Sequence, residues 1–353
     1  MACRFLDGFD QMTVTDMITY SKWTSNSSYT VGSSDTHRRF AGVGQYLFHN
    51  NNSHTFHRDF GSNEASGVFG VAFKIMDSAV AQTLIALADG GTVQCGLALN
   101  SSRQLIVFRQ TPGTAVLGTG ATILNTNQWY YVGWKWKITD TIASGDMQVS
   151  LDGVQEINIT SGDSKVSANA YATIVRLGGA DSVGNSGMTG TYQDDFYWFD
   201  LTGSLCNSDL GPVRVQSLLP TGDGNSSQFT GSDGNSTNNS LLVDESTPNG
   251  DTDYVESSTV NHLDLYATAD TVAATNTIHA VAVNHIAKKT DTDPREIVAT
   301  TRISGANYEA SANKVLSTGY LNHQSIFEQD PAATAAWTKS VLDAAEFGLK
   351  VDV

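Results

Sequence analysis

Cysteine, basic residues and long apolar runs are all scarce in this chain, and each shortage excludes a class of protein. The 353 residues include three cysteines, Cys3, Cys95 and Cys206, which are odd in number and far apart, so no disulfide framework is predicted. Lys and Arg number 20 against 36 Asp and Glu, which gives a net charge of −16. Nucleic acids and anionic membranes bind basic patches, so we expect neither as a partner.

Membrane and secretion signals are missing as well. No stretch approaches the roughly 20 apolar residues that a membrane-spanning helix needs, so we expect no membrane insertion. The first residues, MACRFLDGFD, lack the charged and then apolar pattern of a signal peptide. We therefore expect a soluble protein made in the cytoplasm, unless a leader precedes this sequence.

No amphipathic helix of useful length is predicted in the first 210 residues, where short strands follow one another with turn residues between them. This pattern, with 32 Gly against 6 Pro, is typical of an antiparallel β-sandwich. The predicted strands are Phe5–Phe9, Arg39–Phe48, Val68–Ile75, Thr83–Ala88, Gln94–Leu99, Gln104–Arg109, Ala172–Leu177 and Gln193–Asp200, together with the hairpin described next.

The segment 128–153, QWYYVGWKWKITDTIASGDMQVSLDG, predicts an aromatic-rich hairpin. Its second strand, Met147–Leu151, ends at the turn pair Asp152–Gly153. Side chains alternate between the two faces of a strand, so one face must fill a sandwich core. We expect the core side to hold Tyr130, Val132, Trp134 and Trp136, and the outer side to hold Trp129 and Tyr131.

Five segments in order, LADG, QCGLALNSSRQLIVFR, QWYYVGWKWKI, MQVSLDG and YQDDFYWFDLTG, give the first part of the chain a recognisable layout. This layout resembles the laminin-G-like, concanavalin-A-like lectin jelly-roll superfamily over about residues 1–205. The resemblance implies an antiparallel jelly-roll β-sandwich, and we assign it to residues 1–206. It also implies that the first and last strands of the sandwich pair.

Residues 207–353 differ from the first part in composition and pattern, and they predict a second β-rich module. A polar loop is expected at about 221–253, rich in Ser, Asn, Gly and Asp. Strands are expected at His262–Tyr266, Thr277–Val283, Glu296–Ile303 and Leu349–Val353, and one short helix between Pro331 and Gly348. The layout is similar to modules that follow laminin-G-like domains in structural proteins of tailed phages.

Four aspartates are candidate ligands for a structural calcium ion, because Ca²⁺ prefers carboxylate oxygens. Asp7 and Asp10 lie in and after the first strand, and Asp194 and Asp195 lie in the last. The jelly-roll resemblance brings these strands together. The alternative is that they are polar turn and edge residues, with Asp195 accepting backbone hydrogen bonds. No metal-ligand spacing is visible around the histidines near the predicted strands, such as His285.

A catalytic role would need suitably placed carboxylates, and a sugar-binding role would need accessible aromatic rings. Glycoside hydrolysis needs two carboxylates that flank the bond. Before residue 210 the only glutamates are Glu64 and Glu156, which form no such motif, so hydrolase activity is disfavoured. Trp129 and Tyr131 are candidate sugar-stacking residues, although core packing is the competing explanation for these rings.

These observations together favour a non-enzymatic structural protein of a tailed-phage virion, either a capsid decoration or a tail or fibre component. The expected partners are other virion proteins, further copies of this chain and a host surface glycan, and the expected location is the virion. The segment 221–253 and the C-terminal strand are expected to contact neighbours. A free carbohydrate-binding lectin is the alternative, and a glycoside hydrolase is a weaker one.

Overall fold

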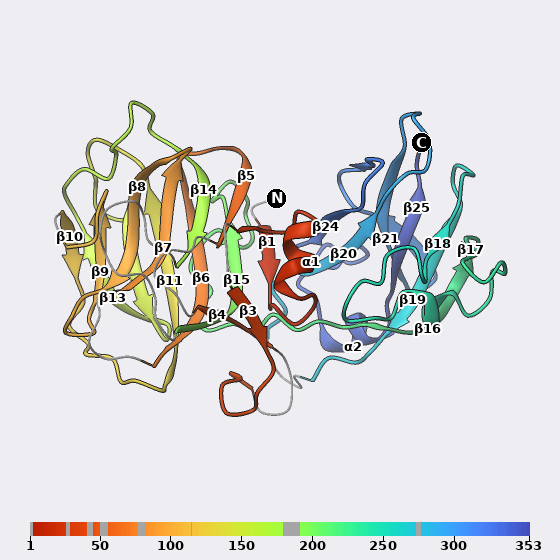
Figure 1. The fold of residues 1–353 in the computed structure, drawn as a ribbon, viewed down its shortest axis with the longest axis horizontal. Helices are drawn as coiled ribbons and strands as arrows, with labels where there is room; N and C mark the ends of the chain where they lie inside the picture. The colour runs from red at the N-terminus through yellow and green to blue at the C-terminus, as the bar shows by residue number, and fades with distance from the viewer. Residues whose placement is uncertain are drawn as a thin grey trace. The chain divides into compact units, whose positions relative to one another are not determined.

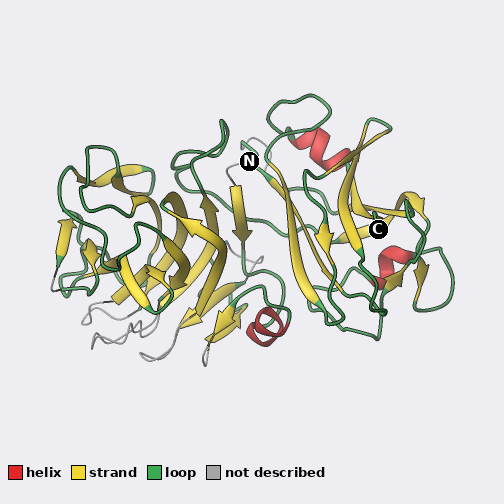
Figure 2. Ribbon diagram, turned by 90° about the horizontal axis from the view of Figure 1, so that it is seen from above, coloured by secondary structure: helices red, strands yellow, loops and turns green. Residues whose placement is uncertain are grey.

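The computed structural model divides the chain into two compact units, and each is mainly β (Figures 1 and 2). Unit 1 comprises Met1–Ile18 and Trp23–Val215, and unit 2 comprises Thr19–Lys22 and Gln216–Val353. No helix in the described part of the chain has the length and apolar character needed to cross a bilayer. The described residues are 3–25, 29–40, 45–49, 56–76, 82–113, 115–178, 191–272 and 277–353.

Unit 1 contains two antiparallel sheets in its described residues. In spatial order, the eight-stranded sheet has β13 (Val154–Ile159), β12 (Met147–Leu151), β11 (Trp129–Lys137), β6 (Ser66–Ile75), β15 (Thr191–Phe199), β4 (Tyr46–His49) and β3 (Tyr29–Gly32), and β1 (Cys3–Asp7) also pairs with β15. The seven-stranded sheet has β10 (Val116–Thr119), β9 (Leu105–Arg109), β8 (Thr92–Leu99), β7 (Gln82–Asp89), β14 (Ala172–Leu177), β5 (Phe56–Glu64) and β2 (Thr24–Ser25). The pairing of β1 with β15 is the one that the jelly-roll resemblance implies.

The core of unit 1 lies between these sheets and is rich in aromatic rings. Phe60 on β5 of one sheet lies 4.3 Å, between ring centroids, from Trp198 on β15 of the other. Trp134 and Trp136 are both 0% exposed, as the alternation in β11 predicts. Burying large rings removes much apolar surface from water, so this layer is the main source of stability in the sandwich.

Helix α1 (Val14–Thr19), the only helix in the described part of unit 1, is not predicted by the sequence pattern. A local signal for it exists in the sequence. The Asp16 amide donates to the Thr13 hydroxyl (3.2 Å), and the Thr13 amide donates back to the Asp16 carboxylate (3.1 Å). This reciprocal pair resembles a capping box, with Asp in place of Glu, and it starts a helix too short to show an amphipathic period.

Unit 2 is built on a six-stranded antiparallel sheet. Its described strands are β16 (Pro220–Ser227), β19 (Leu263–Thr268), β25 (Glu346–Val351), β21 (Glu296–Ile303) and β22 (Ala306–Glu309), with β23 (Lys314–Val315) also on β21. Two strand pairs accompany it, β17 (Thr230–Gly231) with β18 (Val255–Glu256), and β20 (Val281–Ala287) with β24 (Leu321–Phe327). The core cluster contains Ile303, Phe327, Trp337, Leu342, Ala345 and Phe347.

The expected polar loop at 221–253 is wrong, because the segment contains β16, β17 and the 3₁₀ helix η1 (Asn239–Leu242). Two carboxylates, the buried Asp264 and the exposed Asp223, organise it. Asp264 accepts hydrogen bonds from the amides of Gln228 (2.5 Å) and Phe229 (2.7 Å). Asp223 accepts the amides of Asn238 (2.6 Å) and Ser240 (2.8 Å). Composition alone does not reveal such carboxylate-to-backbone bonds, which order a sequence that otherwise reads as a loop.

The C-terminal helix is shorter than the sequence suggests. Helix α2 spans Lys339–Ala344, and the side chain of its N-cap residue Thr338 accepts the Val341 amide (3.3 Å). It therefore starts well after Pro331. Gly348 does not cap this helix but lies in β25, where a Cβ atom would overlap the Asp264 backbone carbonyl of the neighbouring strand. Close approach of two strands, rather than a helix end, explains this glycine.

Candidate functional site

The candidate site lies in unit 1, where a β-bulge interrupts the last strand of the sandwich. The pairing of β15 with β6 shifts register between Asp194 and Tyr197. Asp195 sits in the bulge with φ of 53°, a left-handed conformation that few residues other than glycine adopt and that aspartate tolerates better than most. The bulge redirects the strand's side chains, and bulges occur often beside functional sites.

The carboxylate of Asp195 holds together three separate parts of unit 1. One oxygen pairs with the Arg39 guanidinium, and the other accepts the Val215 amide (2.6 Å). Arg39 also donates to the Val213 carbonyl (2.6 Å), and its guanidinium carbon lies 4.9 Å from the centre of the Tyr131 ring. Burial raises the pKa of Asp195, and the charge of Arg39 opposes that rise. Asp195 therefore accepts a backbone hydrogen bond, as the alternative to metal binding predicted.

Asp194 is buried beside other negative charges. It is 5% exposed, and one of its oxygens accepts the Asp195 amide (2.8 Å). Burial, with the neighbouring charges of Asp195 and Asp10, raises the pKa of Asp194 well above its usual value. Asp10 in turn accepts the Gln45 amide (2.8 Å). The structure thus brings three of the four predicted carboxylates near one another.

These contacts do not form the predicted calcium site. Asp7 accepts the Trp23 indole N–H (2.6 Å) and the Phe9 amide (2.9 Å), so its carboxylate serves the core. The Arg39 cation is paired with Asp195, where a second cation would be repelled. Among the described residues, no group of three or more His, Cys, Asp or Glu side chains is arranged to hold a metal ion. The described residues therefore do not gather Asp7, Asp10, Asp194 and Asp195 around one position, and calcium binding by these residues stays a prediction.

The two predicted sugar-stacking residues have different environments. Tyr131 is 1% exposed, and its hydroxyl donates to the Asp195 carbonyl (3.0 Å). The expectation that its ring faces solvent is wrong, because other parts of unit 1 cover this face of the sheet. Trp129 is only partly buried, and its indole N–H lies within hydrogen-bonding distance of the carbonyls of His37 (3.1 Å) and Arg38 (3.2 Å). Trp129 alone of the pair keeps an accessible surface.

Residues 207–215, here called the covering segment, cover part of the outer face of the eight-stranded sheet. Its Asp209 carboxylate accepts the Tyr197 hydroxyl (3.0 Å), the Ser150 hydroxyl and the Gly211 amide (3.0 Å). A Cβ atom on Gly133 of β11 would overlap the Asp209 carboxylate, so the strand has no side chain where the segment crosses it. Residues 207–215 were expected in the second module, whereas the segment belongs to unit 1.

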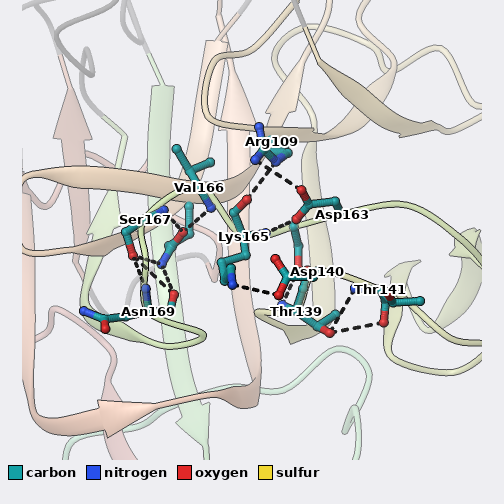
Figure 3. Close-up of polar contacts among 11 residues, drawn as sticks. Arg109, Thr139, Asp140, Thr141, Asp163, Lys165, Val166, Ser167 and Asn169 are labelled. Atoms are coloured by element: carbon teal, nitrogen blue, oxygen red, sulfur yellow. Dashed lines mark hydrogen bonds and ion pairs between the residues drawn. The ribbon is translucent and has the colours of Figure 1, made fainter.

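A second segment, residues 163–171, lies against the seven-stranded sheet (Figure 3). Gln94 of β8 is fully buried, and its amide oxygen accepts the amides of Val166 (2.6 Å) and Ser167 (3.0 Å). Its amide nitrogen donates to the Ser167 hydroxyl and to the carbonyls of Asn169 and Tyr171. Arg109 and Lys165 add ion pairs to Asp163 and Asp140. One buried glutamine thus fixes the connection between β13 and β14.

The carboxylates at the bulge lie away from solvent. Asp194 and Asp195 are 5% and 2% exposed, so no bulky substrate reaches either carboxylate. The two glutamates that precede residue 210 are elsewhere. Glu64 accepts the Ser62 hydroxyl on β5 of one sheet, and Glu156 on β13 of the other accepts the Thr122 amide and hydroxyl.

Comparison with known proteins gave no family model and no curated protein that matches this chain. Among solved structures, Trypanosoma rangeli sialidase in complex with sialic acid is similar at a TM-score of 0.35 and 11% identity, over 48% of this chain and 27% of the sialidase. Domain 4 of AbnA, a GH43 extracellular arabinanase from Geobacillus stearothermophilus, in complex with arabinotriose gives 0.37 and 10%, over 56% and 92%. The CBM40 of Ruminococcus gnavus IT-sialidase bound to α2,3-sialyllactose gives 0.30 and 14%, over 39% and 76%.

This chain therefore spans about a quarter of the length of the sialidases that it matches. The fold class rests on the sheets themselves: the chain is a mainly β protein made of antiparallel sheets, with an antiparallel sandwich in its first unit.

Proposed function

We propose that this chain is a non-enzymatic structural protein of a tailed-phage virion, a capsid decoration or a tail or fibre component that carries a lectin-like β-sandwich. One observation carries the proposal. The polar and aromatic residues on the outer face of the eight-stranded sheet hold two groups in place: Tyr131 and Asp195 contact Arg39, and Tyr197 and Asp195 bind the covering segment. Because these contacts fix the covering segment on the sheet, the sandwich forms a rigid module suited to display on a particle.

The arrangement of carboxylates supports a non-enzymatic role. Glycosidases of the usual type place two carboxylates about 5 to 9.5 Å apart on either side of an accessible bond. In unit 1, Asp194 and Asp195 are buried, and Asp195 is neutralised by Arg39. Incubating the protein with host polysaccharide is expected to release no reducing sugar, and release above a heat-denatured control would contradict this part of the proposal.

The virion assignment is tested on purified particles. Mass spectrometry of gradient-purified virions is expected to detect the chain at a fixed ratio to the major capsid protein, and a particle reconstruction is expected to show it at a symmetric position. The recombinant chain is expected to form a homo-oligomer by light scattering. Absence of the chain from intact particles would overturn the proposal.

Glycan binding is the second candidate, and the partly exposed ring of Trp129 favours it. Aromatic faces bind sugar rings through apolar contacts. On a glycan array, Trp129→Ala is expected to abolish binding. Trp129→Phe is expected to keep most of it, because the ring remains while the indole N–H bonds to His37 and Arg38 are lost. Binding unaffected by Trp129→Ala would exclude this residue, and a lack of binding by the unaltered protein would leave the structural role alone.

A further inference from the structure

Two histidines lie directly opposite each other on the β20–β24 pair of unit 2. The strands are antiparallel, and their register pairs His285 with His323. The centroids of the two imidazole rings are 5.3 Å apart, and the ring planes differ by 25°. Directly opposed side chains on neighbouring strands are close enough to bind a common partner.

Strand alternation places this pair on the side of the two strands that faces the core of unit 2. Phe327 belongs to the core cluster, and Val281 and Val283 pack against it. His285 follows Val283 by two residues on β20, and His323 precedes Phe327 by four on β24, so both share that face. The histidines therefore lie at the edge of an apolar core rather than on an open surface.

Polar atoms without a hydrogen-bond partner gather on this face. Both ring nitrogens of His285, the Nε2 atom of His323 and the hydroxyl of Ser325 are buried and make no hydrogen bond among the described residues. The hydroxyl of Thr301 on β21 is also buried without a hydrogen-bond partner. Thr301 lies on the same face of β21 as Ile303, which belongs to the core cluster. Buried polar groups are usually paired, so these unpaired atoms are available to a ligand.

The protonation of the two rings suits a metal ion. Burial, with smaller contributions from His323 and Lys314, lowers the pKa of His285 to about 3. Burial and Lys314 also lower the pKa of His323. A neutral imidazole offers a nitrogen lone pair, the form in which histidine binds metals.

We propose that His285 and His323 bind a late first-row divalent metal ion such as Zn²⁺, with water in the remaining positions. Zinc holds imidazole nitrogens at about 2.0–2.1 Å in a tetrahedral arrangement, which puts the centroids of two bound rings about 5 Å apart. The observed separation is 5.3 Å. Rotation about the broad χ2 torsion of each histidine aims one nitrogen at a common point without moving the strands.

Lys314 on β23 is the charged group that opposes this site, because it acts on the pKa of both rings. Its ammonium repels a bound cation and weakens the site without removing a ligand. Lys314→Met is therefore expected to tighten Zn²⁺ binding by about threefold to tenfold, since the repulsion acts through a partly desolvated region. A purely adventitious surface site elsewhere on the chain would not respond to this change.

The experiment titrates the full-length, EDTA-treated protein with ZnCl₂ by calorimetry at pH 7.5. One Zn²⁺ per chain is expected. His323→Gln is expected to weaken binding about tenfold or more, because one of the two protein ligands is lost. His279→Ala serves as the matched control, since His279 lies in the same unit outside this strand pair, and it is expected to bind as the unaltered chain does.

Cu²⁺ provides a readout that a merely structural role would not change. The electron paramagnetic resonance spectrum of the Cu²⁺-loaded protein is expected to show hyperfine coupling to two nitrogens, reduced to one in His323→Gln. Circular dichroism establishes that each variant is folded, and His285→Gln provides the second ligand deletion. Absence of Zn²⁺ binding, or equal affinity in folded His323→Gln and unaltered protein, would overturn the proposal.

Discussion

Asp209 of the covering segment offers the sharpest test of how unit 1 is held together. Replacing it by Ala removes the acceptor for the Tyr197 hydroxyl (3.0 Å), the Ser150 hydroxyl and the Gly211 amide. Tyr197 is almost fully buried, so water cannot take over as its acceptor. Hydrogen bonds to a charged group contribute about 1.5–3 kcal/mol, and an orphaned buried partner costs about 1–3 kcal/mol. We expect Asp209→Ala to lower the free energy of unfolding by about 2–4 kcal/mol.

A double-mutant cycle separates this contact from general damage. Tyr197→Phe alone removes the hydroxyl and is expected to cost about 1–2 kcal/mol. In the double variant the orphaned hydroxyl no longer exists, so the combined loss should fall short of the sum by about 1–2 kcal/mol. Urea unfolding followed by tryptophan fluorescence measures all four proteins.

The control for this cycle is Asp140→Ala. Its carboxylate forms an ion pair with Lys165 (2.7 Å), but the side chain is 70% exposed. Exposed pairs contribute about 0–1 kcal/mol, so this variant should be close to the unaltered protein. Additive losses in the Asp209–Tyr197 cycle, or an Asp209→Ala loss no larger than that of Asp140→Ala, would refute the role assigned to the covering segment.

Three further predictions concern the same unit. Gly133→Ala places a Cβ atom against the Asp209 carboxylate and should cost about 1–3 kcal/mol by urea unfolding, and an unchanged midpoint would contradict the close approach. Burial raises the pKa of Asp194, so the folded state binds the carboxyl proton more tightly than the unfolded state does. The free energy of unfolding therefore falls as pH rises from about 4 through the raised pKa. Asp194→Asn should therefore raise the urea midpoint at pH 7 and flatten the decline of the midpoint between pH 4 and 8. An Asn variant that is less stable than the unaltered protein in calcium-containing buffer would instead favour a bound ion. Gln94→Leu removes five hydrogen bonds to residues 166–171 and should make the connection between β13 and β14 cleavable by protease while circular dichroism still shows the sheets.

The sequence predicts the inner half of the sandwich well, and a short-range pattern explains why. Alternation in β11 assigns Trp134 and Trp136 to one face, and the heavier aromatic load of that face marks it as core. The strands at Val68–Ile75 and Ala172–Leu177 have the same local signature and lie where it predicts. These features depend on neighbours two residues apart, so a single chain reveals them.

The outer half of the sandwich could not be predicted in the same way. Alternation correctly puts Tyr131 on the outer face, but it does not tell what covers that face. The covering groups, Arg39 and Asp209, come from segments far from β11 in sequence. Gly133 was the one local hint, since a glycine between aromatic residues in a strand often marks the close approach of another backbone.

The histidine pair shows the same limit for a binding site. Metal-ligand spacing in a sequence detects ligands on one turn or one strand, whereas His285 and His323 meet only through the register of β20 and β24. Between these strands the chain forms β21, β22 and β23, so no local turn fixes that register. A site made by strand pairing over such a distance becomes visible only after the fold is known.

Much of this chain's acidity has a structural use, and that changes what its charge implies. Asp195, Asp209, Asp223 and Asp264 each accept at least one backbone amide from a segment that would otherwise be irregular. Carboxylates used in this way make turns and connections specific, much as helix caps do, because each one satisfies backbone donors that the sheets leave unpaired. Net charge therefore overstates the negative charge that is free to meet partners, and Asp195, one of the calcium candidates, is among the residues that keep these polar, glycine-rich units ordered.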